Sequence, residues 1–312
     1  MPQTTPSPLA TRGVRAFLWA QALSAFIDNA YRFVISAAAV GVTGAAAAGE
    51  LSWMGVVFSA PFLLLAGYAG QIADAYSRRS VFVATRIAET GTMALATLAL
   101  TSGRPELMLA VLLLTGIIAT FFSAAKYGLL PDLLTDAQLS RGNGALQMTT
   151  FVGIILGGAA GPLLHGAWHH APWRIGLVLV AVSVASLAAS LQIPAVPASA
   201  DRAHVSLNPV AGLGRGTRRL LADRTLAQAA AGIAYFWAFG ALVQFALVLV
   251  GRSGMHLDDA RVAALTACLA VGIGLGSVAA GRLSGDKIEL GLAPLGGFGM
   301  GLGALAFAAA PS

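Results

Sequence analysis

The sequence predicts an all-α protein, a polytopic membrane helix bundle with about nine transmembrane helices arranged as six plus three. Composition is the first reason, because 57% of the 312 residues are hydrophobic and only 10% are charged, whereas about a quarter of the residues in soluble domains are charged. The mean hydropathy of +0.78 is the second reason. The third is that the apolar residues form runs of about 20, the length at which an α-helix crosses a bilayer.

Nine apolar runs are long enough to be candidate spans. Basic pairs and prolines, such as Arg78-Arg79 and Pro194, stand between successive runs, where they end one helix and mark the membrane boundary. The predicted spans are 16–42, 51–73, 80–101, 106–129, 144–168, 173–193, 226–250, 260–281 and 290–310.

One long polar segment, rich in Arg, Pro, Ser and Gly, separates the first six runs from the last three. It divides the chain into three predicted parts. These are an N-terminal six-helix half at 1–194, a central loop at 195–225 and a partial C-terminal half of three helices at 226–312.

The basic residues predict how the chain is oriented. If the N-terminus is cytoplasmic, 14 of the 19 Lys and Arg residues fall on the inner side and 4 on the outer side, with Arg32 inside the membrane. Loops on the cytoplasmic side carry the excess of Lys and Arg. We therefore expect a multi-pass membrane protein with a cytoplasmic N-terminus and central loop. The net charge of +6 reflects this topology and does not indicate nucleic-acid binding.

Two glycine-led basic segments occupy equivalent places in the two predicted halves. GQIADAYSRR (70–79) follows the second run, and GSVAAGRLSGDK (276–287) follows the eighth. Parallel six-helix repeats are a known transporter plan. The first segment resembles the loop motif of the major facilitator superfamily, Gly-x-x-x-Asp followed by paired basic residues. That resemblance implies a conformational latch at the cytoplasmic face, and a helix end with solvated charges is the alternative. The latch residues would be Gly70, Asp74, Arg78 and Arg79.

Four further segments resemble the lysophospholipid-transporting branch of this superfamily. They are SAFIDNAYRF (24–33), FFSAAKYGLLPDLL (121–134), RGNGALQ (141–147) and RLSGDKIELGLAPLG (282–296). The resemblance covers most of the chain and implies lysophospholipid transport across the bacterial inner membrane by alternating access. Some members are fused to acyltransferase and acyl-ACP synthetase domains, so an enzyme of this kind is an expected partner or fusion. The family has twelve spans, which predicts that this chain is a fragment or a truncated product.

The chain shows no motif of an enzyme. None of its five histidines has an aspartate five residues further on, so the acyltransferase signature His-x-x-x-x-Asp does not occur. The lone cysteine, Cys268, cannot form an internal disulfide, and no Cys/His spacing suits a metal. We expect a transporter without catalytic residues, cofactor, metal or nucleic-acid partner.

The first span carries a polar stripe on one helical face, formed by Gln21, Ser24, Asp28, Tyr31 and Arg32. A charge at the bilayer centre costs from about 2.5 to more than 10 kcal/mol, depending on the method. Such a stripe persists only where it faces a cavity or a partner. We expect the face opposite the stripe to contact lipid.

The charges in this stripe have two interpretations. Asp28 and Arg32 are one helical turn apart and can neutralise each other. Alternatively, they bind a phosphoethanolamine headgroup, in which the carboxylate meets the ammonium and the guanidinium meets the phosphate. Asn29 lies between them and is part of the same predicted site.

Other spans supply further candidates. Glu89 is a candidate coupling carboxylate, and Arg86 is expected to pair with it or to snorkel to the inner surface. Lys126 is either an end anchor at the inner mouth or, by the resemblance of its Ala-Lys-Tyr segment, a substrate or gate residue. We expect Pro131 to stop its helix and Asp132 to be a solvated loop acid. The predicted substrate-binding residues are Asp28, Asn29, Arg32, Glu89, Lys126 and Gln244.

Two other functions stay open. Gly157, Gly161 and Pro162 in the fifth span resemble the Gly-x-x-x-Gly-Pro segment of drug–proton antiporters, which favours proton-coupled efflux of a drug or metabolite. Tight helix packing with a kink accounts for the same glycines. In the third alternative the chain is the membrane anchor of a fused acyltransferase. The amphipathic cargo and the membrane lipids are the partners that the sequence predicts.

Overall fold

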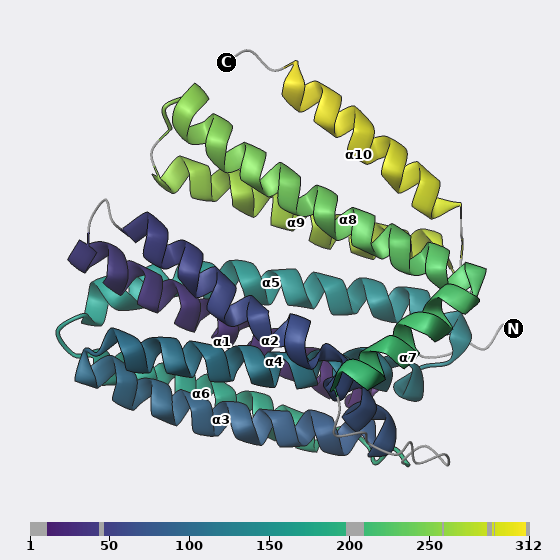
Figure 1. The fold of residues 1–312 in the computed structure, drawn as a ribbon, viewed down its shortest axis with the longest axis horizontal. Helices are drawn as coiled ribbons and strands as arrows, with labels where there is room; N and C mark the ends of the chain where they lie inside the picture. Colours follow the sequence, from purple (N-terminus) through teal and green to yellow (C-terminus); the bar gives the residue numbers. More distant parts are fainter. Residues whose placement is uncertain are drawn as a thin grey trace, which may run out of the picture.

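The computed structural model describes residues 11–43, 47–197, 209–257, 259–285, 289 and 291–309. These residues are almost entirely helical and contain no strand, which confirms the all-α prediction. The helices are α1 (Arg12–Thr43), α2 (Ala47–Ala75), α3 (Arg78–Ser102), α4 (Pro105–Leu133), α5 (Asp136–Trp168), α6 (Pro172–Leu191), α7 (Pro209–Ala222), α8 (Arg224–Leu249), the π-helical turn η3 (Val250–Gly254), α9 (Asp259–Leu283) and α10 (Leu292–Ala308) (Figure 1).

The first six helices pack as one body. Helix α1 packs against α5 and α6, α3 packs against α4 and α6, and α2 packs against α4. Helix α9 joins this body through α5, and α8 packs against α9. In Figure 1 the six helices α1 to α6 form one layered bundle, and α8, α9 and α10 lie on the opposite side of α5 from α3 and α6.

Local signals place several helix ends. Gly103 has a positive φ of 65° and ends α3, and Pro105 starts α4 two residues later. Positive φ favours glycine, and proline suits the first turn of a helix. Thr135 and Gln138 form a capping box that starts α5 at Asp136. Helix α5 therefore begins eight residues before the predicted span at 144.

Every predicted span overlaps one helix, and an additional helix lies in the predicted central loop. This helix, α7 (Pro209–Ala222), was not among the predicted elements. By length and composition, six helices of the described residues could cross a membrane. These candidates are Trp53–Ala75 in α2, α4, α5, α6, α8 and Ala264–Leu283 in α9. The structure thus supports a multi-span helical membrane protein.

Glycines bring α1 and α5 into backbone contact. Gly153, Gly157 and Gly161 recur every four residues along α5 and face α1. A Cβ at any of the three would collide with a backbone carbonyl of α1, at Ala22, Phe26 or Ala30 respectively. Tight packing therefore explains the glycines of the fifth span.

The core contains two apolar clusters with polar residues between them. One cluster includes Phe17 and Phe82, and the other includes Ile27 and Met93. Along α1, α3 and α6, buried polar side chains lie between the residues of the two clusters. We call these side chains the polar layer. They are Gln21, Ser24, Arg86, Glu89, Ser183 and Ser186.

Candidate functional site

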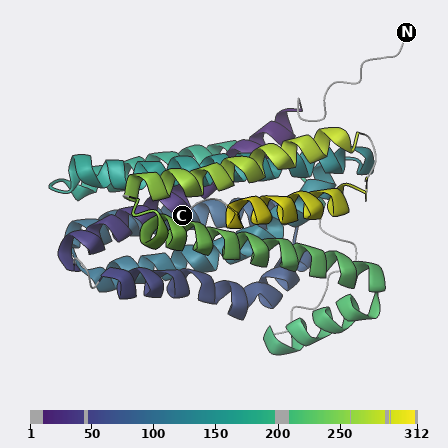
Figure 2. The ribbon, with the colours of Figure 1, turned by 90° about the horizontal axis from the view of Figure 1, so that it is seen from above.

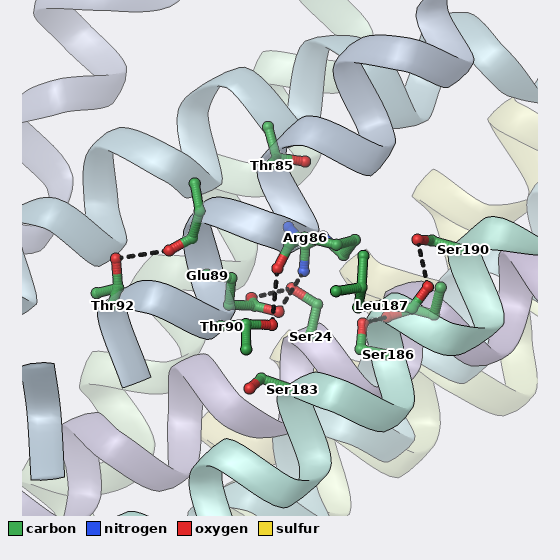
Figure 3. Close-up of polar contacts among 12 residues, drawn as sticks. Ser24, Thr85, Arg86, Glu89, Thr90, Thr92, Ser183, Ser186, Leu187 and Ser190 are labelled. Atoms are coloured by element: carbon green, nitrogen blue, oxygen red, sulfur yellow. Dashed lines mark hydrogen bonds and ion pairs between the residues drawn. The ribbon is translucent and has the colours of Figure 1, made fainter. Parts of the chain in front are cut away.

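The centre of the polar layer is an ion pair within α3 (Figure 3). Arg86 Nη1 lies 2.7 Å from Glu89 Oε2, and Ser24 of α1 donates a hydrogen bond of 2.8 Å to Glu89 Oε1. The predicted pairing of Arg86 with Glu89 is confirmed. The prediction that Arg86 snorkels is wrong, because its side chain is 0% exposed. Its guanidinium instead lies over the ring of Phe122, with Cζ 3.7 Å from the ring centroid.

The buried guanidinium of Arg86 has more donors than partners. Its Nε and Nη2 atoms are buried and have no hydrogen-bond partner among the described residues. Leaving a buried donor unsatisfied costs about 1–3 kcal/mol, and more for a charged group. A ligand that carries oxygen acceptors would satisfy such donors.

Asp28 and Arg32 of α1 do not form an ion pair. Arg32 Nη2 donates a hydrogen bond of 2.7 Å to Asn29 Oδ1, and its guanidinium Cζ lies 4.7 Å from the ring centroid of Phe58 in α2. Arg32 Nε is buried without a partner. The two charges are therefore not in direct contact, although they lie within electrostatic range of each other. Helical spacing allowed the pair, but Asn29 is one residue closer in sequence and takes the guanidinium.

Asp28 is half-buried, and its carboxylate has no hydrogen bond or ion pair among the described residues. It lies within electrostatic range of Glu89, Arg86, Arg32 and Lys126. The structure thus brings together charges from α1, α3 and α4. We call Asp28, Arg86, Glu89 and Lys126 the charged cluster.

Lys126 completes this cluster from α4. It is 8% exposed, and its Nζ lies 5.6 Å from the ring centroid of Phe122 and 4.8 Å from that of Tyr127. A buried lysine of this kind is not an end anchor in the headgroup region, so that interpretation is wrong. Phe122 contacts the cations of both Arg86 and Lys126; it lies in the segment 121–134, but the sequence assigned it no role of its own.

Two hydrogen-bonded residues of the stripe fix α1 among its neighbours. Thr150 of α5 donates a hydrogen bond of 2.9 Å to Gln21 Oε1. Tyr31 donates one of 2.9 Å to the Met108 carbonyl of α4. The stripe thus faces other helices, as predicted, with Gln21 bonded to α5 and Tyr31 bonded to α4.

Gln244 lies apart from the cluster. It is exposed on α8, a helix without buried residues among those described. Helix α8 packs against α7, α9 and η3. The structure therefore does not bring Gln244 together with the other predicted site residues.

The segment after α2 connects three helix ends. Arg78 Nη1 lies 2.9 Å from Asp132 Oδ1 of α4, and Arg78 Nη2 lies 3.8 Å from Asp74 Oδ1. Asp132 is exposed, as predicted, but it lies in α4 rather than in a loop and is an ion-pair partner of Arg78. Helix α4 continues through Pro131 to Leu133, so the prediction that Pro131 stops the helix is wrong.

The other two residues of the predicted latch, Arg79 and Gly70, form no ion pair with α4 among the described residues. Arg79 Nε donates a hydrogen bond of 2.8 Å to the Ile193 carbonyl, and Nη2 donates one of 3.3 Å to Leu191 at the end of α6. Gly70 has no neighbour within 4 Å of an added Cβ. Gly128 of α4, to which the sequence assigned no role of its own, leaves room for the Arg78 side chain, because an added Cβ would lie 2.7 Å from Arg78 Cδ.

Comparison with known proteins agrees with this architecture. The family model described as Major Facilitator Superfamily matches residues 17–312. Curated proteins named Lysophospholipid transporter LplT are similar to the chain. The protein of Pectobacterium carotovorum is 32% identical over 289 residues, which cover 90% of this chain and 67% of the relative. That of Cronobacter sakazakii is 30% identical over 289 residues (90% and 68%), and that of Shigella flexneri 29% over 286 residues (89% and 68%).

Proposed function

Because the chain belongs to the major facilitator superfamily, we propose that it moves lysophospholipids across the bacterial inner membrane by alternating access. The relatives named as lysophospholipid transporters align with about nine-tenths of the chain. The observation that carries the proposal is the charged cluster with Arg32 beside it, a set of buried and half-buried cations and carboxylates without enough partners of their own. A transporter, not an enzyme, is the function that this family supports.

The proposed topology has nine spans, a cytoplasmic N-terminus and a cytoplasmic segment at 195–225. It rests on the distribution of Lys and Arg, of which 14 of 19 fall on the inner side in this orientation. Helices α1 and α3 are included as spans although they are less apolar, because their polar residues face other helices. Lysolipid would enter sideways from the outer leaflet and leave toward the inner leaflet. An acyltransferase or acyl-ACP synthetase, as partner or fused domain, would then reacylate it.

The charged cluster suits the headgroup of a lysophospholipid. The unpartnered N–H groups of Arg86 and Arg32 would donate to phosphate oxygens, and Lys126 would add a third cation. Asp28 would accept a hydrogen bond from the ammonium of ethanolamine. Glu89 holds the Arg86 guanidinium in place. The acyl chain would stay in the membrane, where apolar surface is available.

The remaining predicted residues have separate roles in this proposal. Asn29 orients Arg32 through a hydrogen bond of 2.7 Å. Arg78, Arg79, Asp74 and Gly70 form the latch, in which Arg78 links the end of α2 to the end of α4. Gln244 stays a sequence-based prediction, because α8 does not contact the charged cluster.

Uptake of labelled lysolipid by spheroplasts tests the headgroup site. Charge-assisted hydrogen bonds contribute about 1.5–3 kcal/mol each, so losing one should reduce uptake roughly 10- to 100-fold. Asp28→Asn should reduce uptake of lysophosphatidylethanolamine much more than uptake of lysophosphatidic acid, which has no ammonium. Arg32→Gln should reduce both, because both carry phosphate.

Asp136→Asn is the matched control, because Asp136 is exposed in the first turn of α5. All variants must be compared at equal amounts of folded protein. Equal uptake of both lipids by wild type and Asp28→Asn would rule out the ammonium contact. If the wild type took up no lysolipid but exported a drug or metabolite only when a proton gradient was present, the efflux alternative would be favoured.

A further inference from the structure

Helix α7 is a basic helix that connects the predicted halves and has no role in the headgroup site. It spans Pro209–Ala222, packs against α2 and leads into α8. In Figure 2 it lies at the end of α8 and is set at an angle to the axis of α8. Its sequence, PVAGLGRGTRRLLA, contains three arginines and no acidic residue.

The described arginines around the α7–α8 junction are exposed and unpaired. Arg218, Arg219 and Arg224 have no hydrogen bond or ion pair among the described residues, and all three side chains are exposed. Asp223 is the nearest acid in the sequence. Its Oδ1 accepts hydrogen bonds from the backbone N–H groups of Thr225 (2.8 Å) and Leu226 (3.2 Å), and so it caps α8. The cap fixes the corner between the two helices and leaves the arginines free.

Apolar side chains are exposed beside these arginines. Leu221 is 69% exposed, and Leu226 is 53% exposed. Helix α8 begins at Arg224 and is one of the six candidate spans. If α8 spans a membrane, as its length and composition allow, the junction lies at the membrane surface, where phosphates meet acyl chains. Arginines and leucines at this depth are typical of helices that lie on a membrane surface.

We propose that α7 and the start of α8 form a binding surface for anionic phospholipids of the leaflet in which α8 begins. The guanidinium groups of Arg218, Arg219 and Arg224 bind lipid phosphates, and Leu221 and Leu226 enter the acyl region. An acidic soluble protein would suit the arginines but would not account for leucines exposed at the end of a membrane span. The surface lies outside the charged cluster and concerns the resident lipid rather than the transported one. It goes beyond the proposed function and does not depend on the transported substrate.

Lipid binding at α7 would fix the connection between the two halves at the membrane surface. Because α7 packs against α2 and continues into α8, the anionic lipid would hold these two helices at a set distance from the headgroups. The position of α7 then depends on the charge of the leaflet, and high salt weakens the attraction.

A fluorescent probe on α7 tests this proposal in the full chain. Ala222→Cys, placed in a Cys268→Ser background, provides one exposed labelling site next to Leu221. The protein is placed in nanodiscs of phosphatidylcholine with or without phosphatidylglycerol, so that orientation in a cell does not matter. Quenching by aqueous iodide is compared with quenching by a nitroxide attached to the lipid. We expect phosphatidylglycerol to reduce iodide quenching and increase nitroxide quenching, and added salt to reverse the change.

Charge variants identify the groups responsible. Two arginines near an anionic surface should together change the partition of α7 between water and the membrane surface about 30-fold. Arg218→Gln with Arg219→Gln should therefore remove most of the change in quenching that phosphatidylglycerol causes. Arg218→Lys with Arg219→Lys should keep it. Arg104→Gln with Arg174→Gln removes the same charge from exposed positions elsewhere and should keep the shift as well.

Three results would overturn the proposal. The probe could stay equally accessible to iodide in both lipid mixtures, or the shift could persist in the double glutamine variant. Protection of the probe by an acidic soluble protein, with no response to phosphatidylglycerol, would assign α7 to a protein partner. Because no transport is measured, these outcomes do not depend on whether the headgroup site is correct.

Discussion

Helices α1 and α3 differ from α8 and α10 in how they use polar and apolar residues. The charged residues Arg86 and Glu89 of α3 are buried against α1 and α4. In contrast, α8 and α10 are strongly apolar and contain no buried residue among those described. The less apolar helices are therefore the more enclosed ones. In a membrane protein apolar surface can face lipid at no cost, whereas a buried charge must have a protein partner or a ligand.

This comparison locates function more precisely than hydropathy does. Apolar runs identify where helices occur, but the residues that interrupt an apolar run identify which helices carry a site. In α1 and α3 these residues are held by specific hydrogen bonds, such as the one from Ser24 to Glu89. In α8 the interruption at Gln244 is exposed. Substitutions in the two regions should therefore differ in both size and sign.

The buried ion pair should give the largest effect. Arg86→Met alone leaves Glu89 as an unpaired buried carboxylate, which should destabilise the protein by about 3–5 kcal/mol. We expect little folded protein, measured as the monodisperse fraction and the melting temperature in detergent. Gln244→Met introduces the same side chain at an exposed position of α8 and should leave the monodisperse fraction and the melting temperature unchanged.

A double substitution separates folding from transport. Replacing a buried ion pair with apolar residues is often neutral or stabilising, so Arg86→Met with Glu89→Leu should restore the melting temperature. It should also abolish lysolipid uptake, because the phosphate loses the Arg86 donors. If the double variant both folded and transported normally, the pair would be only structural.

Glycine substitutions should have opposite signs in the two regions. A Cβ on Gly157 of α5 would collide with the Phe26 carbonyl, whereas one on Gly299 of α10 meets nothing within 4 Å. Overpacking typically costs about 1–3 kcal/mol, so Gly157→Ala should lower the melting temperature. Gly299→Ala should raise it slightly, because alanine favours a helix over glycine by about 1 kcal/mol. Equal melting temperatures for the two variants would contradict the close contact of α1 and α5.

The sequence predicted the helices and the identity of most charged residues in the site. Periodicity and length sufficed for these, because a membrane helix needs a long apolar run. The pairing of Arg86 with Glu89 was also predictable, since residues three apart on a helix are neighbours. Helix α7 was missed because hydropathy emphasises apolar runs, and a short helix with three arginines resembles a polar loop.

Contacts between distant segments were not predictable in this way. Arg78 and Asp132 are 54 residues apart, and their ion pair depends on how α3 packs against α4. Helical spacing offered Asp28 as a partner for Arg32, but Asn29 is the partner in the structure. The stack of Arg86 on Phe122 depends equally on the approach of two helices. Spacing along one helix does not contain this information.

The smallest effect should come from the ion pair between Arg78 and Asp132 at the end of the bundle. Both side chains are partly exposed, at 33% and 22%, and pairs open to solvent contribute about 0.2–1 kcal/mol. Asp132→Asn should therefore change the melting temperature by little more than Asp136→Asn, an exposed carboxylate without this partner. Asp132→Asn should have a clearer effect on how often the segment after α2 separates from the end of α4, because the ion pair joins these two segments.

Tyr76 provides a labelling site for measuring that effect. It lies between α2 and α3, two residues before Arg78, and is 58% exposed. In a Cys268→Ser background, the labelling rate of Tyr76→Cys should rise up to about five-fold on adding Asp132→Asn, the change that about 1 kcal/mol allows. High salt should raise the rate of the parent and leave the Asp132→Asn variant nearly unchanged, because screening weakens only an ion pair that exists. If Asp132→Asn and Asp136→Asn give the same rate, Arg78 and Asp132 do not act as a latch, and the pair only caps the ends of α2 and α4.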